Sequence, residues 1–495
     1  MTINNILSRS TKAFFWGVGG AVGKVLGQLI VQITLARILD PVVFGQYAAV
    51  LAVFGLGYVL ADGGFGSALI QKKEINTADV SMALGWSLLF ATVIALLIII
   101  LAPWLARQFG DVTLETIFRV CAILIPFQIL SNLSNSLLRR DLHMRGIQII
   151  QLVSYIICFG GVAVSTALLG WGVWSLVAGF AAQTIFSMMA TYSISRHTLR
   201  PSLIGDRTIM HFGLKTLATE FTSWSMDNLD RFLVGKFWGL YSLGLYSVAF
   251  SLSKAPSGLL VFTAQSIAFA SAARLQSDLA AVRKGFLVAI TAISLITIPI
   301  FSLVAFESET VLYIIYGTKW IKAAPYMTAL AVAIPLFSMG GIASAILRGI
   351  GHVGTELRIL MVAGVVLFCT YLAMKDSSLA NAVWAVPLAY LSRLMLLLFV
   401  LHKKLELQIT DLLHSFRGAL VLSAVGLCVA ALVHGPSTST GMGVMAILAG
   451  SCAILLIFVF KFSWVLGDPL LTMVRGKFST GRLGAAILWL AGERS

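Results

Sequence analysis

The feature that most constrains the fold of this chain is a series of about fourteen apolar stretches, most of them about 20 residues long. A helix of about 20 predominantly apolar residues is long enough to cross a bilayer. Charged residues make up only 11% of the chain, whereas a soluble domain carries about 25%. We therefore predict an all-α integral membrane protein with spans at about 13–36, 46–70, 80–105, 115–138, 147–169, 171–194, 211–237, 240–272, 284–305, 323–348, 357–375, 378–402, 414–434 and 442–463.

The segments between the spans are too short to form a soluble domain, so we expect no separate catalytic head. No zinc motif and no nucleophile elbow occurs in the sequence. The run GVGGAVGKV at 17–25 resembles a phosphate loop, but Val25 stands where Ser or Thr is required, and the run lies inside a span. The sequence thus predicts neither an enzyme nor a nucleotide-binding protein, and no catalytic or metal-binding residues.

The net charge of +15 follows the positive-inside rule better than it fits nucleic-acid binding. If the chain starts in the cytoplasm, about 23 of the 35 Lys and Arg fall on cytoplasmic segments, about six on the opposite side and about six inside spans. This roughly fourfold asymmetry predicts that both termini are cytoplasmic.

An internal repeat divides the chain. LDPVVFGQYAAV at 39–50 matches WGLYSLGLYSVA at 238–249 and pairs Gly45 with Gly244, and SLLRRDLHMR at 136–145 matches AILRGIGHVG at 345–354. Six spans separate the copies, which predicts two lobes of equal orientation. The expected organisation is a cytoplasmic N-terminus 1–12, an N-lobe 13–194, a cytoplasmic linker 195–210, a C-lobe 211–403, spans thirteen and fourteen within 404–463, and a cytoplasmic tail 464–495.

Span seven carries more charge than a lipid-facing helix tolerates, because a charge near the bilayer centre costs about 2.5 kcal/mol or more. Its polar residues fall on one helical stripe that includes Glu220, Asp227 and Arg231. Asp227, Asp230 and Arg231 can neutralise one another, whereas Glu220 has no oppositely charged residue three or four positions away. Glu220 is therefore the best candidate for a titrating residue, and Lys215 and Lys236 are expected at the membrane edges.

Span one contains Lys24, with Gln28 one turn further along the same face. The repeat offset places Lys24 near the level of Glu220 and Asp227 in span seven. Two interpretations stay open: a structural salt bridge between the lobes, or a solvated substrate or coupling site.

Two further spans carry polar residues that allow two interpretations each. Asp62 lies beside three glycines, which suits either a helix break that lines a cavity or a local cap with close helix packing. Span four carries Gln128, Asn132 and Asn135, which suit either a hydroxyl-rich ligand or hydrogen bonds between helices.

Spans eight and twelve each add one cation. Lys254 precedes Pro256 among serines, and a kinked, cavity-facing segment is the sharper interpretation. Arg393 lies about ten residues from the cytoplasmic Lys403 and Lys404, so both the headgroups and a cavity are within its reach.

The run SMDNLDRFLVGKFWGLYSLGLYSVAFSLSKAP at 225–256 resembles the seventh-span signature of Wzx-type polysaccharide flippases, within the multidrug/oligosaccharidyl-lipid/polysaccharide (MOP) exporter superfamily. LADGGFGSALIQKKE at 61–75 and IIYGTKWIKAAP at 314–325 also fit the family, and the likeness is greatest to its xanthan and colanic-acid group. The resemblance implies two six-helix lobes that form a V, with two extra helices. It also implies the transfer of undecaprenyl-diphosphate-linked oligosaccharide across a bacterial inner membrane, from the cytoplasmic to the periplasmic leaflet.

The resemblance also implies roles for the polar residues. Basic residues would hold the diphosphate and amides the sugars, which gives the candidates Lys24, Arg231, Lys254, Arg393, Gln28, Gln128, Asn132 and Asn135. The carboxylates would couple ions or control gating, which gives Glu220, Asp227, Asp230 and Asp62. The coupling ion would be H⁺ or Na⁺, with no other cofactor. The expected partners are the lipid-linked substrate, membrane lipids and a polysaccharide polymerase or co-polymerase, without nucleic acid or nucleotide.

Three other functions are consistent with part of the pattern. A peptidoglycan-precursor flippase shares the spans and the basic residues. A cation-coupled drug antiporter of the same superfamily would favour acidic and aromatic residues over basic ones. A membrane glycan polymerase would carry a large periplasmic loop, and the longest such segment here, about 307–322, is too short.

Overall fold

The computed structural model describes residues 3–204, 207–434 and 440–460. All regular secondary structure in these residues is helical. The chain forms two compact units, Met1–Ser247 (unit 1) and Val248–Ser495 (unit 2). The predicted tail 464–495 lies outside the described residues, and the predicted lobe boundaries stay predictions.

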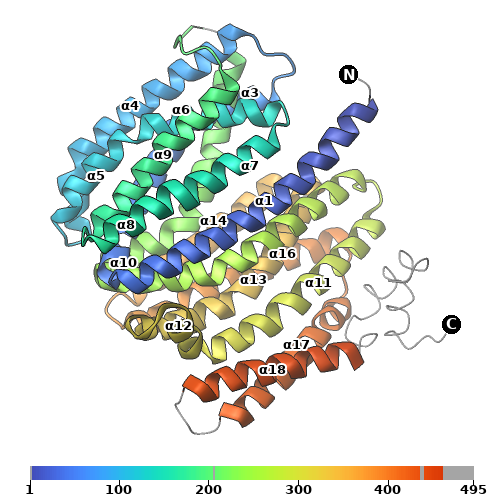
Figure 1. The fold of residues 1–495 in the computed structure, drawn as a ribbon. Helices are drawn as coiled ribbons and strands as arrows, with labels where there is room; N and C mark the ends of the chain where they lie inside the picture. Colours follow the sequence, from blue (N-terminus) through green and yellow to red (C-terminus); the bar gives the residue numbers. More distant parts are fainter. Residues whose placement is uncertain (1–2, 205–206, 435–439, 461–495) are drawn as a thin grey trace. The chain divides into compact units, whose positions relative to one another are not determined.

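Unit 1 is a bundle of membrane helices. In Figure 1, α4 lies beside α5 and α6 beside α9, as their contacts require. The helices are α1 (Ile3–Ile38), α2 (Pro41–Asp62), α3 (Phe65–Gln71), α4 (Thr77–Gln108), α5 (Thr113–Ile123), α6 (Ile125–Arg140), α7 (Met144–Val153), the π-helical η1 (Ser154–Gly161), α8 (Val162–Leu168), α9 (Val173–Ser195) and the first part of α10 (Arg207–Arg274).

The predicted span 46–70 consists of two helices. Helix α2 ends at Asp62, and α3 starts at Phe65. Between them Gly63 (φ 59°) and Gly64 (φ 69°) adopt the left-handed conformation that stops a helix. The break predicted at Asp62 is therefore present.

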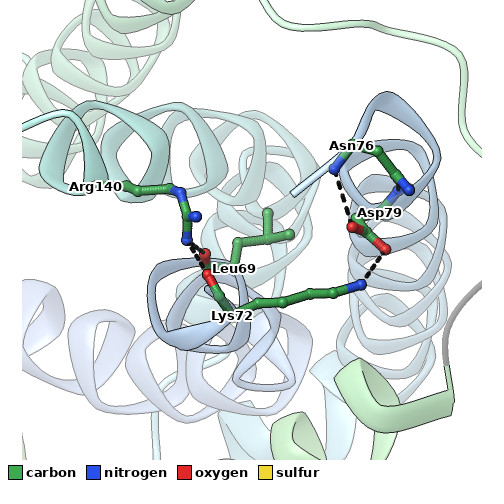
Figure 2. A network of polar contacts seen from close by, with 5 residues as sticks. All are labelled: Leu69, Lys72, Asn76, Asp79 and Arg140. Atoms are coloured by element: carbon green, nitrogen blue, oxygen red, sulfur yellow. Dashed lines mark hydrogen bonds and ion pairs between the residues drawn. The ribbon is translucent and has the colours of Figure 1, made fainter. Parts of the chain in front are cut away.

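The short helix α3 is held at its C-terminal end by side chains (Figure 2). Arg140 of α6 donates to the backbone oxygens of Leu69, at 2.6 Å, and Lys72, at 2.5 Å. The Lys72 ammonium lies 2.7 Å from the carboxylate of Asp79, which also completes a capping box with Asn76 at the start of α4. These bonds satisfy carbonyl groups that a helix end leaves unpaired.

The predicted boundary between spans seven and eight lies at a kink inside α10. Gly239 has φ 80° and ψ 175°, so α10 consists of two helices joined at this residue. A side chain at this φ would be strained, which explains the glycine. The kink lies within two residues of the predicted span ends at 237 and 240.

Unit 2 packs around α13, which contacts α11 and α16, and α17 lies beside α18 (Figure 1). Many residues of α13 are Ala, Gly or Ser, and such small residues allow membrane helices to approach closely. The helices of unit 2 are the rest of α10, α11 (Leu279–Phe306), α12 (Ser308–Tyr316), the 3₁₀ segment η2 (Thr318–Ala323), α13 (Ala324–Gly349), α14 (Val353–Ala373), α15 (Leu379–Ala382), α16 (Ala385–Leu405), α17 (Ile409–His434) and α18 (Thr440–Phe460).

Eleven segments of the described residues are long and apolar enough to cross a membrane. The predicted spans one, seven and eight correspond to α1 and the two parts of α10, which are not among these eleven. The predicted number of about fourteen spans is compatible with this count, and the protein is a multi-pass helical membrane protein.

Candidate functional site

Helix α2 and the first part of α10 run antiparallel and in close contact. A methyl group on Gly55 of α2 would lie 2.8 Å from the indole nitrogen of Trp224. A methyl group on Gly64, after α2, would lie 2.5 Å from the carbonyl oxygen of Gly213 and 2.7 Å from Thr216. Glycines therefore allow α10 to approach α2 closely, and this brings Glu220, one turn after Thr216, beside the end of α2.

Asp62 lies at this end of α2 and accepts two hydrogen bonds. The side-chain amide of Asn132 donates to it at 2.5 Å, and the backbone N–H of Gly64 donates at 3.3 Å. Glu220 is exposed and close enough to interact electrostatically with Asp62. Two predicted gating carboxylates are thus neighbours. The bond from Gly64 fits the interpretation of Asp62 as a local cap, and its place in a cavity stays a prediction.

The Lys24 ammonium is bound to a neutral partner. Its Nζ donates to the amide oxygen of Gln151 in α7 at 3.3 Å. Among the described residues Lys24 and Glu220 form no ion pair, so the predicted opposition of these two charges stays a prediction. Arg139, at the end of α6, lies within electrostatic range of Lys24 and of Tyr58, so this part of unit 1 gathers two cations.

Two residues of the predicted cluster at the end of span seven also bind neutral groups, and the mutual neutralisation of Asp227, Asp230 and Arg231 stays a prediction. Asp230 is buried and accepts from the hydroxyl of Tyr246 and from the backbone N–H of Arg231, at 2.8 Å for the latter. The guanidinium of Arg231 bonds to Asn228 at 3.4 Å, and Asp227 is exposed. Tyr246 belongs to the repeated segment, so Asp230 supports the start of the second part of α10.

The remaining unit 1 candidates are partly buried. Gln28 lies on α1, and Gln128 and Asn135 lie on α6. The side-chain oxygen of Asn135 is buried without a hydrogen-bond partner among the described residues. Such an oxygen can accept a bond from a ligand or from water. The side chain of Lys215 lies outside the described residues, and Lys236 is exposed.

In unit 2, Arg393 of α16 is paired with an acid that the sequence did not single out. It lies 3.5 Å from the carboxylate of Glu356 in α14 and donates to Ser344 at 3.0 Å. Lys254 lies over the rings of Phe250, at 5.0 Å, and Phe337, at 5.3 Å, and both contacts are cation–π interactions.

The residues that sequence reasoning did not identify are neutral or distant contact partners of the predicted site residues. Gln151, Tyr58 and Tyr246 carry no charge that marks them inside an apolar span. Glu356 follows His352 of the second repeat echo by one turn, and this position was the available signal. Together, α1, α2, α6, α7 and α10 bring a mixed set of cations, carboxylates and amides into one membrane-spanning unit. This set suits a polar, anionic headgroup better than an apolar ligand.

Comparison with known proteins gives consistent results. Residues 34–325 match a family described as polysaccharide biosynthesis protein. The succinoglycan biosynthesis transport protein ExoT of Rhizobium meliloti (strain 1021) is 24% identical over 345 residues, 69% of each chain. The teichuronic acid biosynthesis protein TuaB of Bacillus subtilis (strain 168) is 21% identical over 77% of this chain and 79% of its own. The lipopolysaccharide biosynthesis protein WzxC of Escherichia coli (strain K12) is 22% identical over 64% and 65%.

Solved structures show the same fold. The lipid II flippase MurJ in an inward closed conformation superimposes with a TM-score of 0.74 at 14% identity, over 91% of this chain and 99% of its own. An inward-facing multidrug resistance transporter of the MATE family in the MOP superfamily gives 0.61 at 16% identity, over 77% and 94%. The predicted fold class is confirmed by these likenesses.

Proposed function

This chain belongs to the family of polysaccharide biosynthesis proteins, and from that premise we propose that it is a flippase for undecaprenyl-diphosphate-linked oligosaccharides. It moves the repeat unit from the cytoplasmic to the periplasmic leaflet for exopolysaccharide assembly. The path alternates in access between the two sides, and cations and amides bind the headgroup. The isoprenoid tail stays in the bilayer.

The observation that carries the proposal is the polar set of unit 1. Lys24 is bound to a neutral amide, Arg139 lies in electrostatic range of it, and Asn135 keeps a buried oxygen without a partner among the described residues. A diphosphate supplies the negative charge that two neighbouring cations favour, and a sugar supplies hydroxyl donors for an amide oxygen.

Coupling would help this transport. An inside-negative potential opposes outward movement of an anion by about 2.3 kcal/mol per charge per 100 mV. Entry of H⁺ or Na⁺ through the carboxylates Asp62 and Glu220 would offset this load, and Asp227 and Asp230 would contribute to gating. Cations that move with the substrate would offset it too.

The proposal also covers the location, topology and partners of the protein. It resides in the bacterial inner membrane with both termini in the cytoplasm, contacts membrane lipids, and delivers its cargo to a polymerase or co-polymerase. It performs no covalent chemistry and needs no cofactor besides the coupling ion. Nucleotides and nucleic acids are not ligands.

A second candidate is a flippase for a peptidoglycan precursor, which the likeness to MurJ favours. The relatives named for succinoglycan, teichuronic acid and lipopolysaccharide favour export polysaccharides instead. A small-molecule antiporter is the weaker alternative, because the in-span cations Lys24, Arg231 and Lys254 suit an anionic cargo.

The test is the sidedness of the lipid-linked oligosaccharide in a strain that lacks the gene. We expect the unit to accumulate in the cytoplasmic leaflet, protected in spheroplasts from a membrane-impermeant oxidant of sugars. Expression of the protein should restore its exposure outside. Accumulation in the outer leaflet without the protein would contradict the flippase, and retention of lipid II instead would favour the second candidate.

A further inference from the structure

Backbone atoms of α2, or of the two glycines that follow it, come into direct contact with backbone atoms of α10 at two places. The first lies at the start of α2, where Gly45 meets Gly244. The second lies just beyond the end of α2, where Gly63 and Gly64 meet Gly213. All five of these glycines belong to unit 1.

The first contact is reciprocal. A methyl group on Gly45 would overlap the carbonyl oxygen of Leu240 and lie 3.1 Å from the nitrogen of Gly244. A methyl group on Gly244 would overlap the carbonyl oxygen of Pro41 and lie 2.9 Å from the nitrogen of Gly45. Pro41 and Leu240 are equivalent in the repeat, as are the two glycines, so each copy presents the same surface to the other.

The second contact is also made by backbone on both sides. A methyl group on Gly64 would lie 2.5 Å from the carbonyl oxygen of Gly213, and one on Gly213 would lie 2.8 Å from that of Gly63. All atoms nearest to the added methyl groups at the first contact are backbone atoms, whereas the side chain of Thr216, at 2.7 Å, and the ring of Phe65, at 3.2 Å, adjoin the second contact. At the first contact the helices touch through Cα–H groups and carbonyl oxygens, so little side-chain repacking is needed for them to part.

The two contacts are about one bilayer core apart along α2. Gly45 and Gly64 are separated by 19 residues, and at about 1.5 Å per helical residue this is about 28 Å. The hydrocarbon core of a bilayer is about 30 Å thick. The polar residues Tyr58 and Glu220 lie on the segments between the contacts.

We propose that the two glycine contacts are the gates of the transport path, and that one parts while the other stays closed. The inference rests on the proposed function, because only a transporter needs both to open in turn. The segments beside each contact suit such movement. Gly239 and Gly63 have positive φ and interrupt the helices beside the contacts, so the chain can bend there. Hydrogen bonds such as that from Gln46 to Asp111, at 2.7 Å, stabilise the helical turn that contains Gly45.

The first experiment is hydrogen exchange of the full chain in lipid nanodiscs. Gly45→Ala should raise exchange about tenfold at 41–47 and also at 240–246, and lower it at 62–66 and 211–217. Gly213→Ala should give the opposite pattern. Gly161→Ala and Gly258→Ala are matched controls, because no atom lies within 4 Å of the methyl group that each would add.

Opposite changes at the two ends distinguish a gate from a packing defect. A variant that merely loosens the bundle raises exchange at both contacts. That result, or exchange unchanged from the parent in both gate variants, would overturn the proposal.

The second experiment tethers the first contact. Val42 and Tyr241 are equivalent in the repeat, adjoin the contact, and are 41% and 42% exposed. Cysteines at both positions, in a protein whose five native cysteines are replaced, are bridged by a flexible bifunctional methanethiosulfonate. In spheroplasts, the rate at which the lipid-linked unit becomes exposed outside should fall below about a tenth of that in the reduced control, because the bridge blocks an obligatory step. Addition of reductant should restore this rate.

Two results would contradict the gate. Transport that survives complete bridging would show that this contact stays closed in the cycle. Cysteines that label singly but never bridge would show that the helices do not approach at all. The hydrogen-exchange experiment is done without substrate, so its result is independent of the leaflet assay that tests the proposed function.

Discussion

Lys24 of unit 1 and Arg393 of unit 2 are in-span cations that are held by different kinds of partner. In unit 1 Lys24 bonds to the neutral amide of Gln151, so its positive charge stays available. In unit 2 Arg393 pairs with the carboxylate of Glu356 and with Ser344, so its charge is neutralised within the unit. A partner within the protein can neutralise a cation inside a span, so the position of the cation in the sequence does not by itself indicate a binding site.

We expect the greatest loss of stability when the ion pair of Arg393 and Glu356 is broken. Glu356→Leu leaves the partly buried Arg393 without its carboxylate, and removal of one partner from a buried pair costs about 3 kcal/mol. Thermal unfolding in detergent should show the loss. The double variant Arg393→Met with Glu356→Leu should recover most of the stability, and full transport by that double variant would show that Arg393 does not bind substrate.

The second prediction removes the available cation. Lys24→Ala should lower transport about 30-fold, because a hydrogen bond to a charged group contributes about 2 kcal/mol. The measurement is the rate at which the lipid-linked unit becomes exposed outside, normalised to the amount of protein in the membrane. Lys24→Arg keeps the charge and should retain most activity, so equal losses in both variants would contradict an electrostatic role.

The third prediction concerns the exposed carboxylate. Glu220→Gln should lower transport about tenfold and weaken its dependence on the ion gradient, since the coupling group no longer ionises. Its stability should stay within about 0.5 kcal/mol, because the side chain is exposed. Glu74→Gln, at another exposed carboxylate, is the control, and an unchanged gradient dependence in Glu220→Gln would exclude coupling through this residue.

The smallest effect is a pH dependence of stability at the loop between α4 and α5. Burial disfavours the ionised form of Asp111, but hydrogen bonds from Thr113 and Gln46 outweigh it and lower the pKa of this carboxyl below its ordinary value. The stabilisation is therefore complete above the ordinary pKa and is lost as the pH falls through the lowered one. Melting curves of Asp111→Asn should differ from the parent near pH 7 and converge in acid; a constant difference at all pH values would contradict the ionic contribution.

The positions of helices and breaks could be predicted from the sequence because they depend on local residues. The apolar spans, the break beside Asp62 and the turn at Gly239 all follow from composition and from glycine conformations. Hydropathy alone gives 46–70 as one span, and the glycines beside Asp62 indicate the break that divides it into α2 and α3. The repeat predicted the equivalence of Gly45 and Gly244, but not that these two residues touch.

The candidate site was predicted less well, because its geometry depends on partners far apart in the chain. Lys24 and Gln151 are 127 residues apart, and Arg393 and Glu356 are 37 apart. A polar residue in a span gives its depth and not its neighbour. Asn132 illustrates this, since it was a candidate for sugar binding and its amide bonds to Asp62.

The reciprocal contact of Gly45 and Gly244 has a consequence for the origin of the chain. A surface that matches its own copy is the interface of a two-fold symmetric dimer. If the repeat arose by duplication, an ancestor of half the length would need this glycine only once, because a dimer presents it twice. In the present chain the two glycines are encoded independently, and either can be lost by a single substitution.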